Sequence, residues 1–178
     1  MARDVKVYTF DELSEEAKKV AIDNMRYRVA EDLDDFDADD FGETIKEVCE
    51  VFNAESYGNE LTNLHYRGDD YGEYMDENEK ETPETVRNFV EDRLKWGDIN
   101  IDDWGFTGVY SDDAACQYIR KVLNGEENPD SIDEFIEVLG DQIDYQWEKQ
   151  QESNCGDETV AEELSANNYE FLEDGTPF

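Results

Sequence analysis

Carboxylates are the side chains in this sequence that could do chemistry, and metal coordination is the first chemistry to test. Residues 35–39 read Asp-x-Asp-x-Asp, which is how a calcium-binding EF-hand loop begins. Such a loop also needs Gly at its sixth position and Glu at its twelfth, but these positions hold Asp40 and Lys46. His65 is the only histidine and no two cysteines are close in sequence, so a zinc site is not indicated. The sequence predicts no metal site and no cofactor.

Catalytic motifs are also missing from the sequence. A Ser or Cys nucleophile would have His65 as its only possible histidine base, and no Gly-x-Ser-x-Gly or Cys-rich redox motif is present. Gly105 and Gly108 are not part of a Gly-x-Gly-x-x-Gly pattern and no Walker lysine follows them, so no phosphate-binding loop is predicted. Pairs of carboxylates are expected by chance among fifty acidic residues. We therefore expect no catalytic residues and a protein that is not an enzyme.

The carboxylates of residues 130–152 have an ordered spacing. Apolar residues recur here at steps of three and four, which predicts one buried side of a helix: Ile132, Phe135, Ile136, Leu139, Ile143 and Trp147. Acidic residues follow the same steps on the opposite side: Asp130, Glu134, Glu137, Asp141, Asp144 and Glu148. With a rise of ~1.5 Å per residue, successive carboxylates lie about 4.5–6 Å apart along the axis, a spacing that resembles phosphates on a nucleic-acid strand. A solvated face of an acidic protein is the plainer interpretation of this helix taken alone.

The whole chain is strongly acidic, with fifty Asp and Glu against fifteen Lys and Arg and a net charge of −35. From Glu126 to the C-terminus, seventeen residues are acidic and only Lys149 is basic. Such a charge repels nucleic acid and anionic membranes and favours basic partners or cations. Further acidic residues could extend the helical array: Asp34, Asp35, Asp37, Asp39, Asp40, Asp112 and Asp113.

The elements that position these residues follow from periodicity and caps. Helices are predicted at about 14–30, 41–52, 82–97, 111–123, 130–152 and 157–166, with short strands near 5–10, 61–66, 99–110 and 169–172. No β-α-β alternation is visible, so we expect a single α+β domain over residues 1–178, with several amphipathic helices around a small antiparallel sheet. Three widely spaced cysteines, no signal peptide and no apolar span predict a soluble protein of the reducing cytoplasm.

Three stretches resemble a family of small, mostly uncharacterised phage and prophage proteins. VYTFDELSEEAKKVAID, residues 7–23, resembles that family's aromatic-Asp-Glu-Leu-Ser entry into an Ala-rich helix. ELSANNYEFLEDGTPF, residues 163–178, resembles its Asn-aromatic-Glu-Phe strand, acidic-Gly turn and final Phe. Residues 99–115 resemble the family's Phe-Ser-Gly-Phe strand more weakly and have Ser-Asp-Asp-Ala at 111–114 in place of its Gln-Gly-Asp-Gly turn. The resemblance implies a phage origin rather than a mechanism.

Phage-encoded acidic proteins include inhibitors of restriction and CRISPR systems that mimic DNA. We therefore expect a stoichiometric inhibitor in the host cytoplasm whose carboxylates occupy the DNA-binding groove of a basic CRISPR effector or restriction enzyme. One alternative is an acidic accessory or regulatory protein that binds a basic host protein without mimicking DNA. Another is a surface adapted to high salt, which twelve Asn and an even mix of eight Lys and seven Arg do not particularly support.

Overall fold

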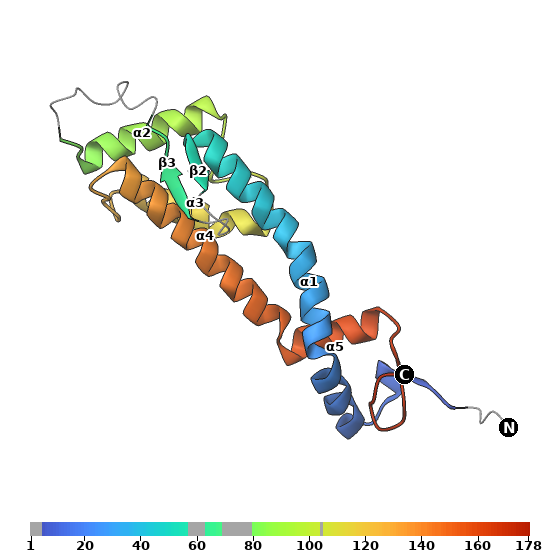
Figure 1. The fold of residues 1–178 in the computed structure, drawn as a ribbon. Coiled ribbons are helices and arrows are strands. Elements are labelled where there is room, and N and C mark those ends of the chain that lie inside the picture. Colours follow the sequence, from blue (N-terminus) through green and yellow to red (C-terminus); the bar gives the residue numbers. More distant parts are fainter. Residues whose placement is uncertain (1–4, 57–62, 69–79, 104) are drawn as a thin grey trace. The chain divides into compact units, whose positions relative to one another are not determined.

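The computed structural model describes residues 5–56, 63–68, 80–103 and 105–178 (Figure 1). Within these residues the chain is mostly helical, with five α-helices and two antiparallel strand pairs. The chain divides into two compact units: a first unit, Met1–Asp37 with Glu148–Phe178, and a second unit, Ala38–Trp147. Each unit has its own hydrophobic core. The predicted α+β class therefore applies only broadly, because the strands are few and short.

The longest element is α1, Glu15–Val51. It begins where the sequence predicts, since the Ser14 hydroxyl accepts a hydrogen bond from the Ala17 amide at 3.2 Å. The sequence also predicts that this helix ends near residue 30 and that a separate helix starts at 41, and this is wrong because α1 continues through residues 31–40. The seven acidic residues of that segment repel one another. Hydrogen bonds from the side chain of Asn154, which is distant in sequence, offset part of this repulsion.

The first unit brings the two ends of the chain together. β1, Tyr8–Thr9, pairs antiparallel with β4, Glu170–Phe171. Both strands are shorter than predicted, and Phe10 begins a 3-10 turn instead of extending β1. The buried rings of Phe10 and Phe171 contact each other edge-to-face with centroids 6.3 Å apart. The N-terminal and C-terminal stretches that resemble the phage family, residues 7–23 and 163–178, thus pack together in one small core.

Close packing at the C-terminal turn adds to this unit. Gly175 has φ +87°, and a Cβ added there would lie 2.0 Å from the Ala17 carbonyl oxygen of α1. Only glycine fits this position without moving backbone. Helix α5, Asp157–Ala166, lies where predicted and contributes buried Val160 and Leu164.

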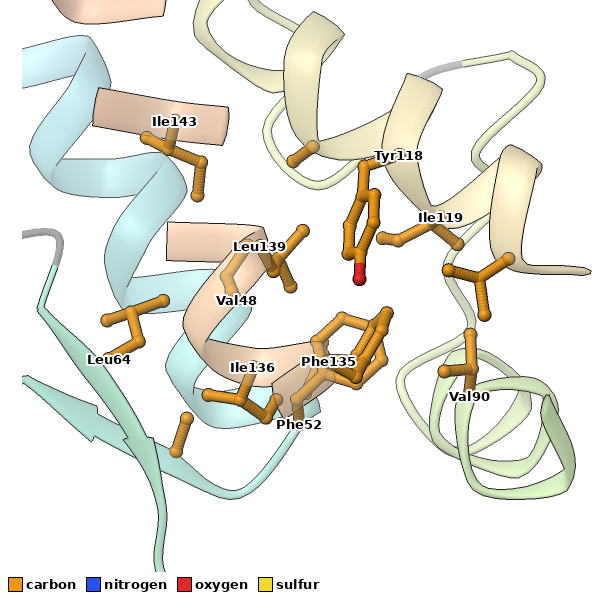
Figure 2. Packing of buried hydrophobic residues seen from close by; sticks show 14 of the residues in the cluster. Val48, Phe52, Leu64, Val90, Tyr118, Ile119, Phe135, Ile136, Leu139 and Ile143 are labelled. Atoms are coloured by element: carbon orange, nitrogen blue, oxygen red, sulfur yellow. The ribbon is translucent and has the colours of Figure 1, made fainter. Parts of the chain in front are cut away.

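The second unit has a core formed by four helices and one strand pair. Its further elements are α2 (Pro83–Trp96), α3 (Asp113–Leu123), α4 (Ile132–Asn154, up to Trp147), β2 (Ala54–Ser56) and β3 (Leu64–Tyr66). Figure 2 shows Phe135 of α4 between Phe52 and Tyr118, with centroid distances of 5.3 and 5.6 Å. The Tyr118 and Phe135 rings are nearly parallel, at 17°. Aromatic contacts of this kind fix α3 and α4 against the end of α1.

Predictions for the second unit differ in outcome. The helix start at Thr82-Pro83 and its end at Gly97 are confirmed by α2. A strand at residues 64–66 is confirmed by β3, whereas residues 61–62 lie outside the described part and β2 was not predicted. The predicted strand or hairpin at 99–110 is wrong, since the described residues of this range form turns with one isolated bridge, Asn100–Gly105. Ser111 lies in a 3-10 turn, and α3 begins two residues later.

Candidate partner-binding surface

Helix α4 has a strictly two-sided segment within the second unit. Five of the six residues predicted for the apolar side have 0% exposure: Ile132, Phe135, Ile136, Leu139 and Ile143. The sixth, Trp147, is partly buried. The opposite side of the helix carries exposed carboxylates: Glu134, Glu137, Asp141 and Asp144. The sequence predicts a helix from Asp130, but α4 starts at Ile132, so Asp130 is exposed just before the helix. We call these five residues the acidic face of α4. The register that the sequence predicts for this helix is therefore confirmed.

Hydrogen bonds fix the start of α4 and with it the acidic face. The Ser131 hydroxyl accepts a hydrogen bond from the Glu134 amide at 3.1 Å, and Glu134 Oε2 accepts one from the Asp130 amide at 2.6 Å. Glu81, just before α2, accepts a hydrogen bond from the Ile132 amide at 3.0 Å. These contacts satisfy amides that a helix start otherwise leaves unpaired. The face is thus held in place before any partner arrives.

The acidic face carries negative charge at regular intervals. Helical geometry places the successive carboxylates of Glu134, Glu137, Asp141 and Asp144 about 4.5–6 Å apart along the axis, compared with about 3.4 Å for each phosphate along one DNA strand. The only basic residue of α4 is Lys149, which belongs to the first unit and pairs with Glu152 at 2.6 Å. Such an array attracts a surface that presents Lys and Arg at similar intervals.

Asp112 lies inside the second unit and not on its surface, with 4% exposure. Its Oδ1 accepts a hydrogen bond from the Thr44 hydroxyl at 2.8 Å, and its Oδ2 accepts hydrogen bonds from the Thr107 and Gly108 amides at 2.6 and 2.8 Å. A buried carboxylate whose oxygens are already used cannot meet a partner. Asp112 is therefore removed from the candidate surface, whereas Asp113 is exposed.

The acidic segment of α1 is divided between the two units. Asp34, Asp35 and Asp37 belong to the first unit, as does Glu148 of α4. Asp34 and Asp37 are half-buried and accept hydrogen bonds from the Asn154 side chain at 2.8 and 2.9 Å, so they help to hold α1 against the end of α4.

Two residues of the same segment belong to the second unit. Asp39 is exposed, whereas Asp40 is half-buried and its carbonyl oxygen accepts a hydrogen bond from the Ser111 hydroxyl at 3.2 Å. The residues best placed to meet a partner are therefore those of the acidic face of α4, with Asp39 and Asp113 exposed elsewhere on the same unit.

A hollow of about 180 Å³ lies beside the acidic face, between α3 and the start of α4. Its lining residues are Tyr118, Lys121, Glu127, Asn128, Pro129, Glu134, Val138 and Gln142. Glu134 is a member of both the hollow and the acidic face. Tyr118 is not among the site residues predicted from the sequence, although a tyrosine on the buried side of the 111–123 helix is a usable signal, because a tyrosine hydroxyl near a core normally needs a hydrogen-bond partner.

No family model, curated protein or solved structure matches the chain. The resemblance of its ends to phage proteins thus stays a prediction. In the described ranges, no helix combines the length and the apolar character needed to cross a membrane. Nor do the described residues contain a group of three or more His, Cys, Asp and Glu side chains that could hold a metal ion.

Proposed function

We propose that this protein is a phage-encoded inhibitor of a host defence enzyme that targets nucleic acid, such as a CRISPR effector or a restriction enzyme. It acts stoichiometrically, as an acidic mimic of DNA that occupies the DNA-binding groove. The observation that carries the proposal is the acidic face of α4, where four exposed carboxylates of the helix, with Asp130 just before it, lie on the side away from five residues with no exposed surface.

The physical basis is competition for the same basic residues. A DNA-binding groove presents Lys and Arg to phosphates, and this electrostatic attraction supplies most of the non-specific affinity for DNA. Carboxylates on a helix that is fixed by its buried side are ordered before binding, so they lose less conformational entropy than a flexible acidic tail would. A net charge of −35 adds long-range attraction to a basic groove.

A charge-reversal experiment tests this proposal. Proteins captured from a bacterial lysate at low salt and released at high salt supply the candidate target, whose DNA binding is then measured with increasing amounts of the protein. Replacing Glu137, Asp141 and Asp144 with Lys should weaken inhibition at least about tenfold, because three attractions become repulsions. Reversing three other exposed acidic residues of the second unit, Glu43, Glu50 and Glu84, is the matched control. Equal inhibition by both folded triple variants would show that the acidic face is not the contact surface.

Competition with DNA separates mimicry from the alternative of a regulatory protein that binds a basic host protein elsewhere. Under the proposal, added duplex DNA displaces the protein from its target, and the target binds one or the other. A ternary complex of target, DNA and this protein would contradict DNA mimicry while leaving a protein-binding role in place.

A further inference from the structure

Tyr118 has a hydroxyl group that the fold does not use. The residue is only 6% exposed, and its ring stacks on Phe135 in the core of the second unit. No hydrogen bond joins the hydroxyl oxygen to another described residue, and this oxygen is not among the buried side-chain atoms that lack a partner, so it is open to solvent. Phenylalanine would make the same ring contacts, so the packing of the core does not depend on the hydroxyl. The hydroxyl is therefore free to serve a ligand.

The surroundings of the hydroxyl place it at the hollow between α3 and α4. Burial, followed by the negative charges of Glu127 and Glu134, raises the pKa of Tyr118. Both carboxylates line the hollow together with Tyr118 itself. Figure 2 shows the Tyr118 side chain extending from α3 towards Phe135, with the hydroxyl oxygen at its far end. Tyr118 and the two carboxylate residues thus line the same hollow.

The rest of the lining supplies the other features of a side-chain pocket. Pro129 and Val138 add apolar surface, and Gln142 adds an amide oxygen that can accept a hydrogen bond. The volume of about 180 Å³ is below the roughly 300–1,000 Å³ of sites for drug-sized molecules. The hollow has room for a single side chain, and not for a cofactor.

We infer that this hollow receives one arginine side chain of the protein partner, with the guanidinium between Glu127 and Glu134 and a hydrogen bond to the Tyr118 hydroxyl oxygen. The inference rests on the proposed function, since it names one specific contact beside the acidic face. A guanidinium has five N–H donors in one plane and flat apolar faces, so it can use carboxylate, phenol and amide oxygens while it packs on Pro129 and Val138. Lysine has a compact, strongly hydrated charge that uses such a set less well.

Lys121 allows a test of whether the hollow binds a cation or an anion. It lines the same hollow and places one positive charge beside the two carboxylates. If the hollow binds a cation, replacing Lys121 with Gln removes a repulsion and strengthens binding. If the hollow binds an anion, the same replacement removes an attraction and weakens binding.

Titration of the full chain with N-acetyl-arginine amide, followed by NMR, measures the contact without the unknown partner. The largest shifts are expected at Tyr118, Glu127 and Gln142, and N-acetyl-lysine amide should bind more weakly. Tyr118→Phe should weaken arginine binding about tenfold, because it removes one hydrogen bond to a charged group and leaves the ring in place. Lys121→Gln should strengthen it several-fold.

Glu127→Gln should weaken arginine binding several-fold, and Glu84→Gln, which removes the same charge from an exposed position of the second unit outside the hollow and the acidic face, is the matched control. Unchanged binding by folded Tyr118→Phe, equal effects of the two glutamate variants, or weaker binding by Lys121→Gln would each overturn the inference. These outcomes are independent of the proposed function, because charge reversal at Glu137, Asp141 and Asp144 tests inhibition and these titrations test the hollow.

Discussion

The buried carboxylate of Asp112 accepts a hydrogen bond from the Thr44 hydroxyl at 2.8 Å, and so connects the turn before α3 to the C-terminal part of α1. The Ser111 hydroxyl lies 2.7 Å from the same Thr44 oxygen. The other carboxylate oxygen accepts hydrogen bonds from the Thr107 and Gly108 amides. One side chain thus satisfies backbone groups that a strand would have paired, which is why residues 107–110 form a turn.

Asp112→Asn should destabilise the protein by about 2–4 kcal/mol, since the new NH2 group would face the N–H donors of Thr107 and Gly108 in a buried site. Urea unfolding followed by circular dichroism measures the change. The neighbouring Asp113→Asn is the control, because Asp113 is exposed, and it should cost less than about 0.5 kcal/mol. Similar losses in both variants would mean that the Asp112 network contributes little.

Asn154→Ala should lower the local stability of the acidic segment of α1. The Asn154 side chain is 3% exposed and donates to both Asp34 and Asp37, so its removal leaves two neighbouring carboxylates without that contact. We expect amide hydrogen exchange of residues 31–37 to become at least about tenfold faster, which corresponds to a loss of about 1.4 kcal/mol. Gln151→Ala, which removes one 3.5 Å contact to Asp34, should change exchange much less. Equal protection in wild type and Asn154→Ala would contradict this role.

Gly175→Ala should destabilise the first unit by more than about 3 kcal/mol. The new Cβ would lie 2.0 Å from the Ala17 carbonyl oxygen, and φ +87° is unfavourable for any side chain. Gly125→Ala is the matched control, because φ is +73° there but no atom lies within 4 Å of an added Cβ. The control should cost about 1 kcal/mol from backbone strain alone. Thermal unfolding compares the two variants, and equal melting temperatures would exclude a clash at Gly175.

Stability should fall at alkaline pH because of Cys116. Burial, and secondly the Asp112 carboxylate, raises the pKa of this thiol from 9.0 to about 11. Between these values the unfolded chain loses the proton and the folded protein keeps it, so the unfolded state is favoured increasingly as pH rises from 9 towards 11. Urea unfolding from pH 8 to 10.5 should show a loss in wild type that exceeds the loss in Cys116→Ala by about 1–2 kcal/mol. If wild type and Cys116→Ala lose the same free energy of unfolding over this pH range, the thiol does not contribute to the pH dependence.

Local signals in the sequence predicted the elements whose causes are local. Thr82-Pro83 and Gly97 define the ends of α2 because caps act within one turn of the helix. The two sides of α4 were predictable for a similar reason, since the 3.6-residue period alone assigns Ile136 and Glu137 to opposite sides. The acidic residues of the candidate surface on α4 were thus accessible from sequence.

Tertiary structure alone decided the features that depend on distant partners. The sequence predicts a break in α1 at residues 31–40, but Asn154, more than a hundred positions later, hydrogen-bonds the acidic segment and the helix continues. Asp112 and Asp113 are indistinguishable in the sequence, and only the position of Thr44 makes one a buried acceptor and leaves the other exposed. Tyr118 became a candidate binding residue only once Glu127 and Glu134 were seen beside it. Periodicity and caps describe a helix by itself, whereas burial and pairing depend on which residues the fold brings together.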